Sequence, residues 1–267
     1  MRSIGITPQI SPVVPEALVP VLLVVTALGD PAVVVALATL VYWLGPRYDL
    51  CDRRAGATVL ATVFLALAST LFLKYAFAMP RPPAELMLVP EDGAGFPSGH
   101  VTAATATYAA LAVYGNRFSS GRRYTLAAAL VSVVALTRVL LGVHYVVDVV
   151  AGLVLGLVAL AAVRWVSREN LALAFATSVP LAFGGTLLAG TVEAALLIGF
   201  VSGATLGWWL VDGRLTGQPI PIGAIVGAGI VGAVLIGVGY ESGVPVVAGF
   251  TAAGAGALFL ALPALDA

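Results

Sequence analysis

Residues 145–163 read YVVDVVAGLVLGLVALAAV, an almost uninterrupted apolar run whose one charged side chain is Asp148. A helix needs about 20 mostly apolar residues to cross a bilayer, so this run predicts a membrane-spanning helix. The runs are continuous rather than alternating, which favours helices over a β-barrel. Further candidate spans lie at 57–79, 100–116, 125–142, 171–190, 192–211, 219–239 and 243–263.

The composition of the 267-residue chain indicates the same fold class. Hydrophobic residues make up 60% and charged residues 10%, whereas a soluble domain carries about 25% charged residues. Thirteen basic and thirteen acidic residues balance, so no nucleic-acid partner is expected. The single cysteine, Cys51, excludes an intrachain disulfide framework. We therefore expect an all-α, polytopic membrane helix bundle in the cell membrane.

The segment 12–44 is harder to interpret, because Gly-Asp-Pro at 29–31 interrupts it. We expect 31–45 to form a span. The preceding residues, 12–28, form either a short span or a helix lying in the membrane interface.

The charges of the predicted loops indicate the orientation of the chain. One side carries Arg47, Arg53, Arg54, Arg117, Arg122, Arg123, Arg164, Arg168 and Arg214. The positive-inside rule makes that side cytoplasmic. The opposite loops carry Glu85, Glu91, Asp92, Glu193 and Glu241. Only Arg81 and Arg138 break this pattern, and both lie at outer helix ends.

The first unusual polar segment is KYAFAMPRP, residues 74–82. Lys74 is the sole lysine of the chain, against twelve arginines. An ionisable residue within a membrane span is a functional candidate, although chance and base composition also explain a single lysine. Lys74 and Arg81 lie about two helical turns apart, on nearly one face, and Pro80 and Pro82 end the helix.

The second segment is Pro97-Ser98-Gly99-His100, at the entrance to the next predicted helix. Ser98 suits an N-cap position, and Gly99 allows a ligand to approach the backbone closely. Free amide groups at a helix N-terminus favour an anion. His100 falls in the first turn, at the membrane surface.

The third segment runs from Thr137-Arg138 to His144 and Asp148. Arg138 lies near the outer end of one span, and His144 and Asp148 share a face of the next at i and i+4. A carboxylate there accepts the Nδ1–H of the histidine and leaves Nε2 free as a nucleophile.

Each of these residues has a plain structural explanation when taken alone. An outer arginine anchors to headgroups, an interfacial histidine is solvated, and Asp148 caps its helix. Together, however, three cations, two imidazoles and one carboxylate converge on one face of a very apolar protein. The unpaired cations repel one another, and a dianionic phosphate offsets that repulsion.

This combination of residues predicts phosphoryl chemistry. Lys74, Arg81 and Arg138, with the amides near Ser98 and Gly99, are suited to clamp phosphoryl oxygens. An imidazole Nε2, such as that of His144, attacks phosphorus, and a second imidazole, such as His100, protonates the leaving oxygen. No metal or other cofactor is expected, because no carboxylate cluster exists for Mg²⁺ and the zinc donors are too few.

The three segments fit the motifs K-x6-R-P, P-S-G-H and R-x5-H-x3-D, in that order. This arrangement resembles the type 2 phosphatidic acid phosphatase (PAP2) family, which is related to acid phosphatases and vanadium haloperoxidases. The resemblance covers about residues 15–168, with Thr137 where the family often has serine. It implies a helical core, an outward-facing site and metal-independent dephosphorylation. It also implies that His144 is the nucleophile, that Asp148 orients it and that His100 is the acid. Phosphate would be bound by Lys74, Arg81, Ser98, Gly99 and Arg138.

We therefore expect a PAP2-like catalytic core over 1–168 and, over 169–267, an extension of about four transmembrane helices without an assigned role. Glycines recur there at four-residue spacing, which favours close helix packing within the chain, with a homo-oligomer as the second interpretation. They are Gly199, Gly203, Gly207, Gly223 and Gly227.

The function expected is an integral-membrane phosphatase whose site faces the extracytoplasmic side. Its partners are the bilayer and its substrate, a lipid phosphate monoester or a prenyl diphosphate, and a phosphohistidine carries the reaction. A membrane phosphotransferase or a phosphatase for soluble esters is the alternative among enzymes. An anion or lipid-phosphate transporter is the alternative of another class. A transporter predicts polar residues at the membrane midplane, on broken helices, whereas the charged residues of this sequence lie at one membrane interface.

Overall fold

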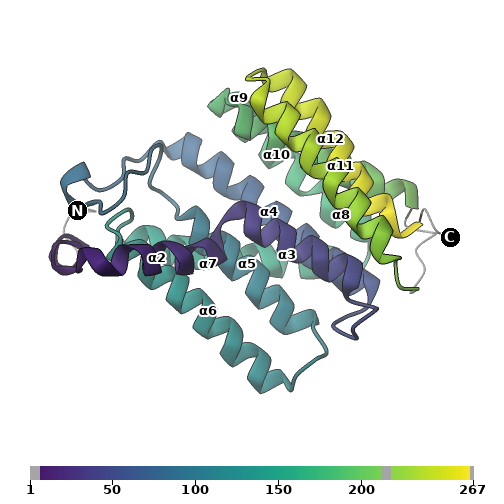
Figure 1. Ribbon diagram of the computed structural model, residues 1–267, viewed down its shortest axis with the longest axis horizontal. Coiled ribbons are helices and arrows are strands. Elements are labelled where there is room, and N and C mark those ends of the chain that lie inside the picture. The colour runs from purple at the N-terminus through teal and green to yellow at the C-terminus, as the bar shows by residue number, and fades with distance from the viewer. Residues whose placement is uncertain (1–6, 212–217, 265–267) are drawn as a thin grey trace.

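The computed structural model describes residues 7–211 and 218–264, and every regular element within them is a helix (Figure 1). Seven helical stretches there are long and apolar enough to cross a membrane. They are α4 (Arg53–Phe77), α6 (Ser120–Leu140), α7 (Val146–Val166), the pair α8 (Leu171–Ala176) and α9 (Ser178–Ala189), α10 (Val192–Val211), α11 (Ile222–Glu241) and α12 (Pro245–Ala261). The expected polytopic helix bundle is confirmed. Arg214, one of the expected loop arginines, lies outside the described residues.

The N-terminal segment differs from the expected separate span at 31–45. After the short α1 (Thr7–Ile10), α2 (Val19–Thr26) and α3 (Pro31–Leu44) pass as a membrane element only together, bent by 48°. The 14 residues of α3 reach about 21 Å, less than the about 30 Å of the hydrocarbon core. Asp30 causes the break, because its carboxylate accepts the amide of Ala32 (2.8 Å) and caps α3.

Helix α4 lies at the centre of the molecule, with 78% of its most apolar stretch buried. Helices α5, α6 and α7 lie on one side of it and α9 to α12 on the other (Figure 1). The 16-residue α5 (Gly99–Tyr114) packs against α4, α6 and α7. Gly152 of α7 permits this approach, since a Cβ there would come within 2.7 Å of the Ser98 carbonyl oxygen.

The helices of the C-terminal extension pack against one another through glycine. The stripe predicted on α10 consists of Gly199, Gly203 and Gly207. A Cβ on Gly199 or Gly203 would clash with the backbone of α12, at Gly249 and Ala253. Packing within the chain, the favoured interpretation, is therefore confirmed for this stripe. Gly223 of α11 faces open space, and a homo-oligomer stays a prediction.

The extension is also hydrogen-bonded to the rest of the bundle. The Tyr42 hydroxyl donates to the Leu260 carbonyl oxygen (2.9 Å), and Trp43 Nε1 donates to that of Phe259 (2.9 Å). Arg53, expected as a loop charge, is buried, and its Nη2 donates to the Gln218 carbonyl oxygen (2.9 Å). One continuous apolar core therefore joins α3 and α4 to α10, α11 and α12.

The loop between α4 and α5 folds back over the turn between α6 and α7. Leu88 N donates to the Leu141 carbonyl oxygen (3.0 Å). The next residue, Gly142, has φ +74°, and a Cβ there would clash with the carbonyl oxygen of Leu86. Only glycine fits this contact without strain, and the contact holds the loop against the ends of four helices.

Candidate active site

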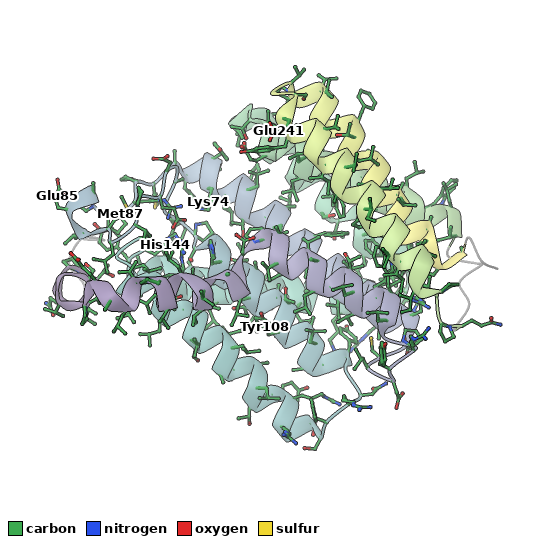
Figure 2. The ribbon with its side chains drawn as sticks, viewed as in Figure 1. Lys74, Glu85, Met87, Tyr108, His144 and Glu241 are labelled. Carbon is green, nitrogen blue, oxygen red and sulfur yellow. The ribbon has the colours of Figure 1, made fainter. Side chains whose placement is uncertain are left out.

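A cavity of about 340 Å³ opens at the end of the bundle where α4 and α6 finish and α5, α7 and α10 begin, here called the site end. Five of the predicted site residues line it: Lys74, Arg81, Gly99, His100 and His144. Figure 2 shows the side chains of Lys74 and His144 at this end, with Glu85 and Met87 of the loop beyond them. The three others, Ser98, Arg138 and Asp148, are buried beside it. The structure thus brings the three motifs together, while the role of each residue stays a prediction.

His144 lies in the turn before α7, and only 1% of its surface is exposed. Its Nε2 lies 3.1 Å from Arg81 Nη1. A guanidinium only donates hydrogen bonds, so Nε2 must be the acceptor and the ring proton must reside on Nδ1. This tautomer directs the lone pair of Nε2 toward the cavity side occupied by Arg81. It is the form required of an imidazole nucleophile.

Asp148 lies next to the other ring nitrogen of His144, Nδ1. The distance from His144 Nδ1 to Asp148 Oδ2 is 3.6 Å, which is longer than a hydrogen bond. The same oxygen accepts the amide of Tyr145 (3.0 Å) and so caps α7. Asp148 therefore acts as a helix cap and also stands where a small shift would orient His144. Catalytic hydrogen bonds are often long before substrate binds.

The pKa of His144 is lowered to about 4, chiefly by burial and also by the positive charges of Arg138 and Arg81, even though Asp148 acts to raise it. An imidazole with this pKa is neutral at neutral pH, and with its proton on Nδ1 the Nε2 atom is unprotonated.

Glu91, from the loop over the site, joins the two arginines. Its Oε1 pairs with Arg81 Nη2 at 2.9 Å, and its Oε2 forms a close ion pair with Arg138 Nη2. Burial raises the pKa of Glu91, but Arg138 and Arg81 outweigh that effect and hold it below its ordinary value. A charged carboxylate therefore presents two oxygens to the two guanidinium groups. A phosphate group offers them the same kind of acceptor.

Each of the three cations also donates to an uncharged group. Lys74 Nζ donates to the carbonyl oxygen of Ala94 (2.6 Å), and Arg81 Nε donates to that of Asp92 (3.0 Å). Arg138 Nη1 donates to the Thr26 hydroxyl, at 3.2 Å. These contacts fix the positions of the three cations without neutralising them.

Ser98 and Gly99 begin α5 next to this cluster. Ser98 occupies the N-cap position, but its hydroxyl makes no capping bond. That hydroxyl is buried and has no hydrogen-bond partner within residues 7–211 and 218–264. A Cβ on Gly99 would lie 3.6 Å from Cε of Lys74, so any larger side chain would crowd the lysine. Within the same ranges, no three His, Cys, Asp or Glu side chains gather as a metal site.

Among the cavity-lining residues that sequence reasoning missed, three bear on the chemistry or come from the extension. Glu91 was treated as an ordinary loop charge, although its position between two outer arginine motifs was a usable signal. Glu193 and Leu197, from α10, line the cavity as well. They belong to the extension, and no pattern in the sequence connects them with the motifs.

Comparisons with known proteins agree with this geometry. Residues 55–172, which contain all three motifs, match the family model of the PAP2 superfamily. The crystal structure of a transmembrane PAP2-type phosphatidylglycerolphosphate phosphatase from Bacillus subtilis is similar, with a TM-score of 0.54 and 25% identity. The match covers 61% of this chain and 83% of that one. No protein with a curated description matches the sequence. Residues 55–172 of this multi-pass membrane protein therefore match the PAP2 superfamily in sequence, and its helices resemble a transmembrane PAP2 fold.

Proposed function

We propose that this protein is an integral-membrane lipid phosphatase that forms a phosphohistidine on His144. The observation that carries the proposal is the 3.1 Å distance between His144 Nε2 and Arg81 Nη1, in a cavity that Lys74 and His100 also line. The similar structure from Bacillus subtilis supports it, since that protein is described as a phosphatidylglycerolphosphate phosphatase.

The reaction begins when a phosphate monoester replaces the Glu91 carboxylate between Arg81 and Arg138. The two guanidinium groups and Lys74 then hold the phosphoryl oxygens. Nε2 of His144 attacks phosphorus, and the bond from phosphorus to the ester oxygen breaks. His100, in the protonated form that the neighbouring phosphate dianion favours, gives a proton to that oxygen, so the substrate leaves as an alcohol.

The second half of the reaction releases phosphate. Neutral His100 takes a proton from a water molecule, whose oxygen attacks the phosphorus atom of the phosphohistidine. The P–N bond breaks, and its electron pair returns to Nε2 of His144. Asp148 stabilises the positive imidazole that exists between the two steps, in the way that the aspartate of a Ser-His-Asp triad does.

We also propose that the site faces the extracytoplasmic side. The site end is opposite to the loops and helix ends that hold Arg47, Arg54, Arg117, Arg122 and Arg164, and the positive-inside rule assigns that side to the cytoplasm. An impermeant phosphate ester added outside sealed cells tests this. Hydrolysis before lysis supports the assignment, and hydrolysis only after lysis contradicts it.

The function itself is tested by phosphate release from the purified protein in detergent. The substrates are phosphatidate, phosphatidylglycerolphosphate, a prenyl diphosphate and p-nitrophenyl phosphate, with the His144→Ala variant as control. We expect release by the wild type without added metal and none above background by the variant. Acid-stable phosphate on the protein, or near-normal turnover by His144→Ala, would contradict a phosphohistidine, which is acid-labile.

A further inference from the structure

The cavity extends much deeper than a phosphate group requires. It follows one face of α4 from Lys74 to Leu67, seven residues or about 10 Å along the helix. Its upper part holds the charged groups of the site. Its lower part is lined on α4 by Leu67 and Leu71 and is completed by Pro31 at the start of α3.

The opposite wall of this lower part comes from the extension. Helix α10 runs antiparallel to α4, and its first turn lies at the site end. Glu193 and Leu197 occupy positions i and i+4, so they share a face of α10, and both line the cavity. Leu197 lies about 6 Å deeper than Glu193 along the helix, at the side of the apolar part.

The wall is firmly held in place. Helix α9 packs directly behind Leu71, because a Cβ on Gly185 would lie 2.9 Å from Cδ2 of that leucine. The Thr186 hydroxyl donates to the carbonyl oxygen of Ala194 (2.9 Å), which ties α9 to the first turn of α10. Protein interiors rarely leave voids larger than a water molecule. A supported apolar cavity beside a phosphate-sized cluster of cations therefore fits an amphiphilic ligand.

We propose that Leu197 of the extension, with Pro31, Leu67 and Leu71, forms a groove for the aliphatic chain of the substrate. The extension would thus determine specificity for long-chain phosphate esters. This inference rests on the proposed phosphatase function. The substrate class is then phosphate esters with a long aliphatic chain, which lies along α4 while the phosphate group lies at His100 and His144.

The test compares two tryptophan substitutions on α10. Leu197→Trp fills the apolar part of the cavity, whereas Leu210→Trp makes the same change at a residue that is 54% exposed and lies at the opposite end of the helix. Each variant is assayed on dioleoyl phosphatidate in micelles and on p-nitrophenyl phosphate. For Leu197→Trp we expect kcat/KM to fall at least about tenfold on phosphatidate and to change less than about twofold on the aryl ester.

The outcomes separate the inference from the function on which it rests. An equal loss on both substrates, or no loss on either, overturns the groove while the phosphatase stands. A wild type that hydrolyses neither substrate overturns the function itself. Leu210→Trp should behave as the wild type on both substrates, and a selective loss there would also contradict a role specific to Leu197.

A binding measurement covers the case in which Leu197→Trp does not fold. A phosphatidate with a photoreactive diazirine midway along its chain is cross-linked to the wild-type protein. We expect labelling of residues 192–200, suppressed by excess unlabelled phosphatidate but not by phosphatidylcholine. Labelling that phosphatidylcholine suppresses equally, or that misses this segment, would overturn the proposal.

Discussion

The helices that surround the candidate site and the helices of the C-terminal extension fill their interiors with different groups. Among the buried residues between α4 and α7 are Ser98, Arg138, His144 and Asp148. In the described part of residues 169–264, Ser178 is the one buried Ser, Thr or charged residue. Burying a charged side chain costs free energy unless it is paired and hydrogen-bonded. The comparison teaches that the first region holds buried polar groups at this cost, whereas the second is built for close packing.

The largest expected effect concerns a residue of the candidate active site, Asp148. Asp148→Asn keeps an oxygen that can cap α7 but removes the charge beside His144. We expect kcat on p-nitrophenyl phosphate to fall by about 10³-fold or more, since the corresponding change in a Ser-His-Asp triad costs about 10⁴. The midpoint of thermal unfolding in detergent should hardly move. Near-normal turnover would show that Asp148 serves only as a cap.

The next effect concerns the glycine-mediated helix packing in the C-terminal extension. Gly203→Val places a side chain against the backbone of Ala253, so we expect a loss of about 1–3 kcal/mol in stability. Gly223→Val is the matched control, because no atom of another element among residues 7–211 and 218–264 lies within 4 Å of a Cβ built there. Thermal unfolding of both variants measures the difference. The kcat of folded Gly203→Val on p-nitrophenyl phosphate should be unchanged, and a large loss would mean that packing and chemistry are not separable.

A smaller effect concerns Glu91, the carboxylate between Arg81 and Arg138. If it competes with phosphate, Glu91→Gln should lower the inhibition constant of inorganic phosphate about tenfold, the equivalent of about 1.4 kcal/mol. Glu85→Gln, an exposed change in the same loop, should have no effect. Weaker inhibition in Glu91→Gln would indicate instead that this carboxylate helps to hold the ligand.

The smallest change is expected in the titration of His144. His100→Asn leaves His144 as the only histidine of the chain, so its ring can be followed by nuclear magnetic resonance after selective labelling. With a pKa of about 4, the ring is neutral above that pH and protonates only as the pH falls through it. The ring signal should therefore stay constant from pH 5.5 to 7.5. A midpoint near the ordinary value of 6.5 would contradict the effect of burial.

Much of the fold was predictable from the continuous apolar runs. The expected span 57–79 corresponds to α4, which begins earlier because Asp52 caps it by accepting the amide of Ala55 (2.7 Å). Arg53 can enter the helix because backbone carbonyl oxygens surround it. The break between α2 and α3 was visible in the sequence at Gly-Asp-Pro, but the sequence did not show that the two helices form one bent element, whose packing depends on tertiary contacts. One of them is at Gly29, where a Cβ would lie 2.7 Å from the His100 carbonyl oxygen.

The site was predictable to the extent that its residues belong to local motifs. Lys74 and Arg81, or His144 and Asp148, are related by helical spacing, and that spacing is visible in the sequence. Glu91 reaches the arginines through the fold of a loop, and Leu197 reaches the cavity through the packing of α10. No periodic pattern in the sequence indicates either contact, so only the three-dimensional structure reveals them.

The hydrogen bonds that cross from the early helices to the extension limit how this protein can be shortened. A chain ending near residue 168 would leave the Tyr42 hydroxyl, Trp43 Nε1 and Arg53 Nη2 without their acceptors at Leu260, Phe259 and Gln218. Unsatisfied donors facing lipid cost several kcal/mol each. The smallest stable recombinant product therefore includes the terminal helices, even though the family signature stops at residue 172.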